Sequence, residues 1–322
     1  MTTHPLVFVA GHRGLIGSAV LRTLAAHGRM RALVRERSEL DLADPWATRR
    51  FFLAHRPEYV VLAAGRSGGI LENLRHPADL LHDNLAIQTS VLRAAQESGV
   101  RRLVFYASSC MYPRDADQPM DESALLTGRP EPSSLPYACA KLAGVQACLA
   151  WNRQIGEPRF LPLIPNSVYG PGDDFDADSA HVLAALIRRF SEAAATGAAR
   201  VTLWGSGAPQ REFVYADDVA EATLALLEGE IAGLELPLNI ASGEEITIRE
   251  LAQKIATLAG YHGEIQWDRG KPDGAPRKLL DGRRLAQWGW TARVTLADGL
   301  RRTLDWYRAQ PTPKLPGTDT DA

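Results

Sequence analysis

Short apolar runs alternate with amphipathic stretches along the first half of the chain. The runs that fit buried strands are residues 6–11, 31–35, 59–65 and 101–109. The stretches that repeat apolar positions at helical spacing are residues 17–28, 44–57 and 83–100. This alternation predicts a parallel sheet with helices on both faces, and a ligand crevice at the carboxyl ends of the strands.

The second half of the chain has a less regular pattern. Residues 160–172 begin as an apolar run, and residues 179–197 fit a helix. Residues 213–229 fit a strand followed by a helix, so we expect the chain to return to the sheet there. Two amphipathic helices follow at residues 247–260 and 294–310. The expected fold is α/β, a doubly wound parallel (Rossmann) sheet with a smaller C-terminal lobe.

Composition and charge narrow the class of protein. The 322 residues are 45% hydrophobic, with a formal net charge of -2 and no basic stripe, so nucleic acid is not an expected partner. No apolar run approaches the roughly 18 residues of a membrane helix. The first strand runs directly from the N-terminus, which argues against a removable signal peptide. Three cysteines without scaffold spacing fit a reducing cytoplasm.

Glycines stand where the first strand meets the first helix. Gly11, Gly14 and Gly17 follow the pattern G-x-x-G-x-x-G. Such glycines permit a tight turn and let a pyrophosphate approach the helix N-terminus. The motif is weak alone, but its position between a strand and a helix favours a dinucleotide site.

The end of the second strand bears on the choice of cofactor. A carboxylate there favours NAD by binding the ribose, whereas arginine accommodates the 2′-phosphate of NADP. The stretch after the second strand contains Arg35 and Arg37, and the glycine turn contains Arg13, so we expect NADP. Glu36, between the two arginines, leaves NAD as the alternative. Asp41 and Leu42 are candidates for the adenine pocket, with helix capping as the alternative for Asp41.

Tyr137 and Lys141 form a Y-x-x-x-K pair on one face of a predicted helix. A free tyrosine, with a pKa of about 10, is a poor acid-base catalyst near neutrality. A lysine ammonium nearby is expected to lower that pKa, so that the pair can donate a proton to a carbonyl oxygen. Ser108, at the end of an intervening strand, completes a reductase set.

These motifs resemble those of the extended short-chain dehydrogenases and, more closely, of the GDP-L-fucose synthase family, the GDP-4-keto-6-deoxymannose 3,5-epimerase-4-reductases. The resemblance runs from about residue 6 to residue 308. Its most specific segments are "VAGHRGLIGSA", "GGI", "SSCMYP", "YACAKLAG", "YGPGDDF", "HVLAALIRRF", "LWGSG", "REFVYADD" and "KPDGAPRKLLD". It implies NADPH as cofactor, a GDP-sugar substrate, a two-lobed monomer and a homodimer, with Ser108, Tyr137 and Lys141 as the reductase triad.

The resemblance also assigns roles to Cys110 and His181, as the acid and base of the epimerase. A ketone at C4 acidifies the hydrogens on C3 and C5, and a thiol and an imidazole can exchange such protons at neutral pH. Asp178 or Ser179 could cap the helix that His181 begins, whose positive end would depress the histidine pKa. Without the resemblance, Cys110 could be a packing residue and His181 a cap. The remaining cysteines are expected in the core, at Cys139 and Cys148.

The resemblance implies a wider set of binding residues and no metal site. Further cofactor contacts are Leu15, Ile16, Ala107, Ser108, Lys141, Pro165, Asn166, Ser167, Val168 and His181. The expected substrate contacts are Arg189, Trp204, Arg211 and Asp273. Helix geometry keeps Arg188 as an alternative to Arg189, and Trp204 could instead pack within the lobe.

We expect residues 1–170, with a returning segment at about 212–242, to form the NADP-binding domain. Residues 171–211 and 243–310 would form the substrate-binding lobe, and residues 311–322 a flexible tail.

Some positions depart from the family pattern. Ser167 stands where asparagine is usual, Arg66 and Ser67 replace Lys-Val, and residues 172–181 are more acidic. These departures leave open a related 4-keto sugar such as a GDP-6-deoxy-heptose, or a protein that epimerises without reducing. A non-catalytic NADP-binding sensor is the alternative of another class; retention of every catalytic side chain argues against it.

Overall fold

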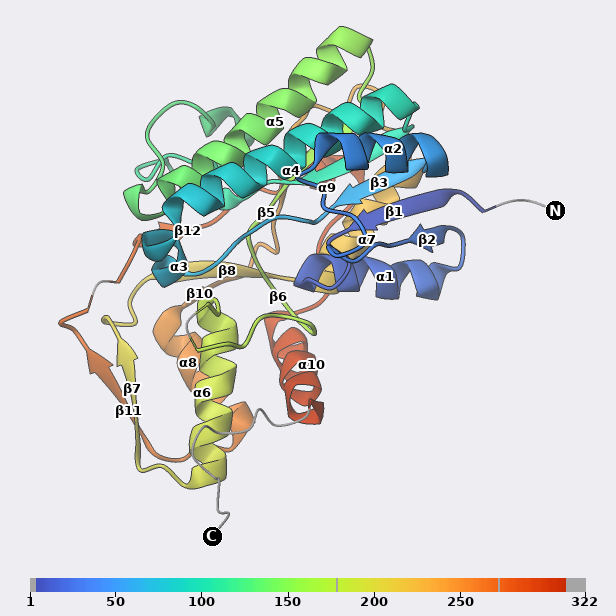
Figure 1. Ribbon diagram of the computed structural model, residues 1–322. Coiled ribbons are helices and arrows are strands. Elements are labelled where there is room, and N and C mark those ends of the chain that lie inside the picture. Colours follow the sequence, from blue (N-terminus) through green and yellow to red (C-terminus); the bar gives the residue numbers. More distant parts are fainter. Residues whose placement is uncertain (1–3, 178, 272, 311–322) are drawn as a thin grey trace.

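A six-stranded parallel sheet forms the centre of the protein (Figure 1). The computed structural model describes residues 4–310 except residues 178 and 272, so the predicted tail at 311–322 lies outside the described residues. In sheet order the strands are β2 (Arg31–Leu33), β1 (Leu6–Ala10), β3 (Tyr59–Leu62), β4 (Arg102–Tyr106), β5 (Phe160–Pro165) and β9 (Leu238–Ile240).

Helices cover both faces of this sheet, as the alternating pattern predicted. One face carries α2 (Pro45–His55), α4 (Pro77–Ser98) and α5 (Leu135–Ile155). The other face carries α1 (Leu15–His27) and α7 (Ala216–Glu228). Successive strand residues alternate between the two hydrophobic clusters, with Val7 and Val9 on the α1 side and Phe8 and Ala10 on the α2 side. The expected doubly wound α/β fold is therefore confirmed.

The chain returns to the sheet within the expected segment at about 212–242, but not through the strand at its start. Residues 210–215 form β8 (Gln210–Tyr215), which does not join the main sheet. Instead β8 pairs with β6 (Ser167–Tyr169), β10 (Glu245–Thr247) and β12 (Arg277–Lys278). The return is made by α7, which packs beside α1, and by β9, which pairs with β5.

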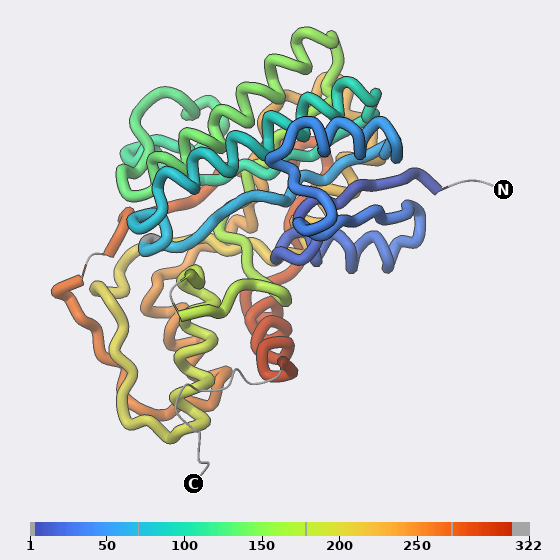
Figure 2. Tube along the Cα trace, viewed as in Figure 1, coloured from blue at the N-terminus to red at the C-terminus, as the bar shows by residue number. Residues whose placement is uncertain are grey.

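A third hydrophobic cluster organises the lower part of the molecule in Figures 1 and 2. Residues of α6, β7, β8, α8 and α10 contribute to it. The helices here are α6 (Val182–Thr196), α8 (Ile248–Ala259) and α10 (Leu296–Ala309). α9 (Arg283–Trp288) instead packs beside β9, and its Leu285 belongs to the cluster on the α1 side of the main sheet. A two-stranded parallel sheet pairs β7 (Arg200–Trp204) with β11 (Glu264–Asp268).

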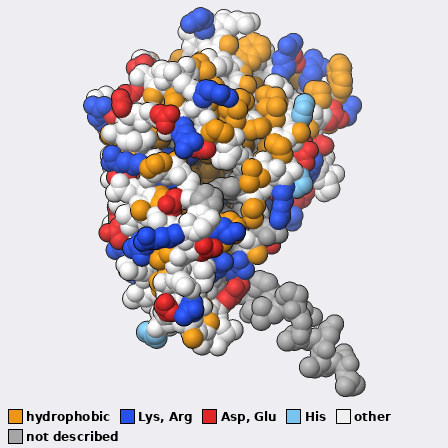
Figure 3. Space-filling model, turned by 90° about the vertical axis from the view of Figure 1, so that its left-hand side faces the viewer, with side chains coloured by type: hydrophobic (Ala, Val, Ile, Leu, Met, Phe, Trp, Pro, Cys, Tyr) orange, Lys and Arg blue, Asp and Glu red, His pale blue; other side chains and the backbone are white. Residues whose placement is uncertain are grey.

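Short helices complete the fold around the carboxyl ends of the main strands. They are α3 (Ile70–Arg75) and the 3-10 turns Ser109–Met111, Glu122–Ala124 and Pro132–Ser134. Seen from the left-hand side of Figure 1, the surface is hollowed between the upper and lower parts, and Lys and Arg side chains lie around the hollow (Figure 3). Among the described residues, no helix is both long enough and apolar enough to span a bilayer.

Candidate active site

The glycine turn between β1 and α1 is as tight as its motif predicts. Gly11 has φ +83°, in the left-handed region, and a Cβ there would lie 2.6 Å from the backbone nitrogen of Ala64. Gly17 leaves no room for a side chain against the Gly11 carbonyl oxygen. α1 begins after Gly14 with no side-chain cap and no acidic residue in its first turn. Its first amide groups, including those of Leu15 and Ile16, are thus suited to a pyrophosphate.

Charged residues gather where β2 approaches this turn. Glu36 pairs with Arg13 at 2.9 Å and lies 3.3 Å from the His12 ring. Arg37 is exposed and makes no hydrogen bond or ion pair with any described residue. Arg35 points elsewhere, since its guanidinium packs over Phe51. Arg37 is therefore the guanidinium left available for a phosphate.

Asp41 and Leu42 follow this strand end. Leu42 is buried, and the exposed Asp41 carboxylate accepts a hydrogen bond from the Ala43 amide at 3.0 Å. The helix-capping alternative for Asp41 is wrong, because Asp44 caps α2 by accepting from Trp46 and Ala47.

Ser108, Tyr137 and Lys141 meet just beyond the end of β4. Tyr137 and Lys141 lie one turn apart on α5, with the Lys141 Nζ 5.9 Å from the centre of the Tyr137 ring. Lys141 is buried and donates to the carbonyl oxygen of Tyr106 at 3.0 Å. The Ser108 side chain hydrogen-bonds with the Tyr137 phenol.

Burial governs the acidity of both α5 side chains. It raises the pKa of the Tyr137 phenol, as does the nearby Cys110, and the hydrogen bond with Ser108 offsets only part of the rise. The expected net lowering of this pKa is therefore wrong, because burial decides its direction. Burial also lowers the pKa of Lys141 to about 8. A phenol that keeps its proton near neutral pH is suited to act as an acid.

Cys110 shares the Ser108 hydroxyl with Tyr137. The Cys110 amide donates to Ser108 Oγ at 3.2 Å, within the 3-10 turn that follows β4. The Lys278 Nζ, from β12, lies 3.4 Å from the Cys110 Sγ. Burial raises the pKa of the thiol, but the Lys278 charge and hydrogen bonds from Ser108, Lys278 and Ser134 outweigh it, so that the pKa is lowered overall. This thiol is not a simple packing residue.

His181 is the N-cap residue of α6. The residue is exposed to solvent, yet the pKa of its ring is lowered overall. Desolvation by the surrounding protein and the charge of Lys278 lower this pKa, and the negative charge of Asp174 offsets part of the effect. The charge of Lys278 thus acts on both Cys110 and His181. The helix begins with His181 itself and has no side-chain cap, so the expected capping by Ser179 is wrong. Asp178, the other proposed cap, lies outside the described residues.

The remaining predicted cofactor residues lie in or next to the strands β4, β5 and β6. Pro165 ends β5, and Ala107 is buried directly after β4. Asn166 is buried and fully engaged: it accepts from Ser109 and donates to Glu212 and to the Lys278 carbonyl oxygen. Its side chain thus holds β12 in place, and its backbone amide donates to the Ile240 carbonyl oxygen at 3.2 Å. Ser167 and Val168 are partly exposed in β6.

Of the predicted substrate residues, the structure brings Arg211 near both Cys110 and Asp273. Arg188 pairs with Glu192, whereas Arg189 has no partner among the described residues, so Arg189 is the better anion ligand. The pKa of Arg211 is lowered overall, because the effect of burial outweighs the raising effects of the neighbouring Asp273 and Cys110.

Trp204 ends β7 with 53% of its surface exposed, so lobe packing does not explain it. The Lys271 Nζ lies 5.3 Å from the centre of its ring. Nearby, Asp273 accepts from the Ser206 amide and hydroxyl, which lower the carboxyl pKa. The site therefore offers a flat aromatic surface beside an ionised carboxylate.

The profile of the NAD dependent epimerase/dehydratase family matches residues 7–241. The chain belongs to this family. It is 48% identical to GDP-L-fucose synthase 1 of Arabidopsis thaliana over 94% of this chain and 92% of that protein. It is 44% identical to the GDP-L-fucose synthase of Escherichia coli (strain K12), over 94% of this chain and 96% of that protein. A solved GDP-mannoheptose C4 reductase from Campylobacter jejuni with NADP bound is 30% identical, with a TM-score of 0.86 over 96% of this chain and 99% of that one.

In this member of the epimerase/dehydratase family, two residues near the catalytic side chains were not predicted from the sequence. Lys278 lies in the segment "KPDGAPRKLLD", but only the pairing of β12 with β8 brings it to Cys110. Asn84 of α4 is buried beside Gly65, close to Lys141. The prediction of a core position was right for Cys148 and wrong for Cys139, which is exposed.

Proposed function

We propose that this protein converts GDP-4-keto-6-deoxy-D-mannose to GDP-L-fucose, by epimerisation at C3 and C5 and NADPH-dependent reduction at C4. The observation that carries the proposal is that Ser108 contacts both Tyr137 and Cys110. The reductase and epimerase groups therefore face one sugar in one pocket. The names of the GDP-L-fucose synthases at 44–48% identity support this substrate.

Epimerisation is assigned to Cys110 and His181. One group removes the proton on C3 or C5, the C4 oxygen carries the resulting enolate charge, and the other group returns a proton to the opposite face. A thiol of lowered pKa and a histidine of lowered pKa can both exchange protons near neutrality. Lys278 stabilises the thiolate form of Cys110.

Reduction is assigned to Ser108, Tyr137 and Lys141. Tyr137 donates its proton to the C4 oxygen, Ser108 hydrogen-bonds that oxygen, and the Lys141 ammonium stabilises the phenolate that remains. NADPH, when bound, supplies the hydride to C4. We assign the pyrophosphate to the turn from Gly11 to Gly17 and the 2′-phosphate to Arg37 with Arg13.

The substrate is assigned to the second lobe, formed by residues 171–211 and 243–310. Arg189 and Arg211 would bind the diphosphate, because guanidinium groups suit phosphate oxygens. Trp204 would stack on the base and Asp273 would bind its edge. A homodimer in the cytoplasm completes the proposal.

A GDP-6-deoxy-4-keto-heptose is the second candidate substrate. The similarity to the Campylobacter jejuni GDP-mannoheptose C4 reductase favours it, as do Ser167 and the acidic segment at residues 172–181. Both candidates require the same reductase chemistry, so the sugar is what an assay must separate.

The test is conversion of each 4-keto nucleotide sugar with NADPH in heavy water, read by NMR. The wild type should oxidise NADPH and give GDP-L-fucose deuterated at C3 and C5. Tyr137→Phe should lose reduction by about 10²–10⁴-fold while deuterium uptake persists. Cys110→Ser should lose deuterium uptake and release a C4-reduced sugar with unchanged C3 and C5. No turnover of either sugar by the wild type, or normal deuteration by Cys110→Ser, would contradict the assignment.

A further inference from the structure

The segment that follows β3, residues 63–69, touches three parts of the proposed active site. At its start, Ala64 packs on the glycine turn, 2.6 Å from where a Cβ on Gly11 would stand. In its middle, a Cβ on Gly65 would lie 3.5 Å from the Lys141 Nζ. At its end, the Gly69 amide donates to the Ser179 carbonyl oxygen at 3.2 Å, two residues before His181. We call these residues the β3–α3 segment.

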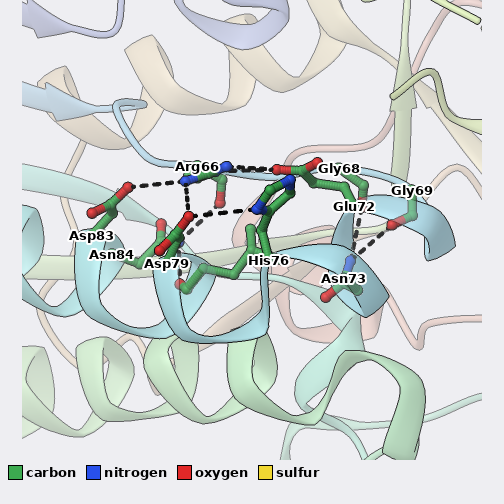
Figure 4. Close-up of polar contacts among 10 residues, drawn as sticks. Arg66, Gly68, Gly69, Glu72, Asn73, His76, Asp79, Asp83 and Asn84 are labelled. Carbon is green, nitrogen blue, oxygen red and sulfur yellow. Dashed lines mark hydrogen bonds and ion pairs between the residues drawn. The ribbon is translucent and has the colours of Figure 1, made fainter. Parts of the chain in front are cut away.

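Arg66 fixes this segment to two helices (Figure 4). Its guanidinium donates to Glu72 of α3 at 2.9 Å and to Asp79 of α4 at 2.9 Å, and Asp83 lies 3.6 Å away. The Asn84 side chain donates to the Arg66 carbonyl oxygen at 2.9 Å. Backbone and side chain of Arg66 are thus both held, and a guanidinium shared by several carboxylates has a defined orientation.

The other end of the segment meets the chain that carries His181. Asn73 of α3 donates to the carbonyl oxygens of Gly68 and Gly69, both at 3.0 Å (Figure 4). A Cβ on Gly69 would lie 3.3 Å from the Ala180 carbonyl oxygen. The backbones of Gly69 and Ala180 therefore approach closely, and the place of α3 determines where the residues before His181 can lie.

We propose that Arg66 is a positioning residue for His181, acting through Glu72, α3 and the Gly69–Ser179 hydrogen bond. The inference rests on the proposed function of His181. Ser108 lies in the turn after β4 and Tyr137 on α5, and among the described residues Arg66 makes no hydrogen bond or ion pair with either element. Loss of the Arg66 ion pairs should therefore misplace His181 more than the reductase groups. The ketone would then be reduced before both centres are inverted.

The test is the product made by Arg66→Gln from GDP-4-keto-6-deoxymannose and NADPH in heavy water, resolved by NMR. A displacement of about 1 Å can slow a catalysed step about 100-fold, so the fraction of incompletely epimerised, C4-reduced sugar should rise at least about tenfold. Arg66→Lys keeps the charge and should restore much of the normal product. NADPH affinity should stay within about twofold of the wild type, because Arg66 contacts no part of the glycine turn.

Gly69→Ala is a second, independent variant. Its methyl group would press on the Ala180 carbonyl oxygen and should give the same shift in product with the Arg66 ion pairs intact. Arg101→Gln is the matched control: Arg101 pairs with Glu58 at 3.0 Å, just before β3 and β4, at the amino ends of the strands and so at the end of the sheet away from the site. Its product should match that of the wild type.

The outcomes separate the two proposals. An inactive wild type would refute the proposed function. An active wild type with unchanged product from both Arg66→Gln and Gly69→Ala would overturn the role of Arg66. Equal losses of deuterium uptake and reduction in Arg66→Gln would also overturn it, because they indicate general destabilisation.

Discussion

At the scale of single residues, the contact between Lys278 and Cys110 makes a prediction about thiol chemistry. The ammonium 3.4 Å from the Sγ favours the thiolate, which is the form that reacts with alkylating reagents. Lys278→Met should raise the Cys110 pKa and slow its alkylation at neutral pH by about tenfold or more, as expected on removing an opposite charge within about 4–6 Å.

The measurement is the rate of iodoacetamide labelling at Cys110 against pH, with the labelled peptide identified by mass. Lys254→Met, on the exposed side of α8, is the control and should leave the profile unchanged. Superimposable profiles for Lys278→Met and the wild type would show that the lysine does not set the reactivity of this thiol.

Arg37 makes a second prediction, on the choice between nicotinamide cofactors. Arg37 has no partner among the described residues, whereas Glu36 already engages Arg13. A charge-assisted hydrogen bond is worth roughly 1.5–3 kcal/mol, so Arg37→Ala should raise the NADPH dissociation constant about tenfold or more. NADH lacks the 2′-phosphate, and its affinity should hardly change. Fluorescence titration of both cofactors checks this, and equal wild-type affinities would remove the basis of the prediction.

Motif spacing found the residues that lie close together in the chain, and missed those brought together by folding. Ser108 and Cys110 share a turn, and Tyr137 and Lys141 share a helix, so local pattern sufficed. Lys278 lies 168 positions from Cys110, and only the register of β12 on β8 joins them. The pKa of Tyr137 was predicted in the wrong direction because burial cannot be read from spacing.

At the scale of elements, a buried hydrogen bond ties β4 to α7. The hydroxyl of Tyr106, the last residue of β4, lies 2.5 Å from the Thr223 Oγ1. The Thr223 hydroxyl in turn donates to the Val219 carbonyl oxygen. Thr223→Val keeps the shape but leaves the Tyr106 hydroxyl buried without a partner, which should cost about 1–3 kcal/mol of unfolding free energy. Urea unfolding monitored by circular dichroism measures this.

The double variant Tyr106→Phe with Thr223→Val provides the control. It removes both polar groups, so most of the lost stability should return. A double variant less stable than Thr223→Val by the full cost of a second defect would contradict this account of the contact.

Elements were predictable where their apolar pattern was long. The buried runs of β1, β3, β4 and β5 and the period of α6, α8 and α10 all appear in the sequence. β9 has three residues, too few to show a period, and so the return to the sheet was assigned to β8. α3 has six residues, too few to show a helical period, and the hydrogen bonds of Glu72 and Asn73 link it to the β3–α3 segment.

At the scale of the whole molecule, the main sheet and the second sheet meet around buried polar groups. Glu212 is fully buried on β8 and accepts hydrogen bonds from Asn166, Gly243 and Leu280. Asn166 follows β5 of the main sheet, while Leu280 follows β12 of the second sheet. The position of Lys278 relative to Cys110 therefore depends on both sheets at once.

The order of the elements along the chain determines which fragments of the protein could fold when expressed alone. The last strand of the main sheet, β9, and one of the helices that cover it, α7, are encoded after α6, β7 and β8. A fragment ending near residue 170 would expose the edge of β5 and the apolar surface that α7 covers, so it should aggregate when expressed alone. A fragment that ends after β9 would keep both the last strand and α7, and should be recovered in the soluble fraction more readily than the shorter one.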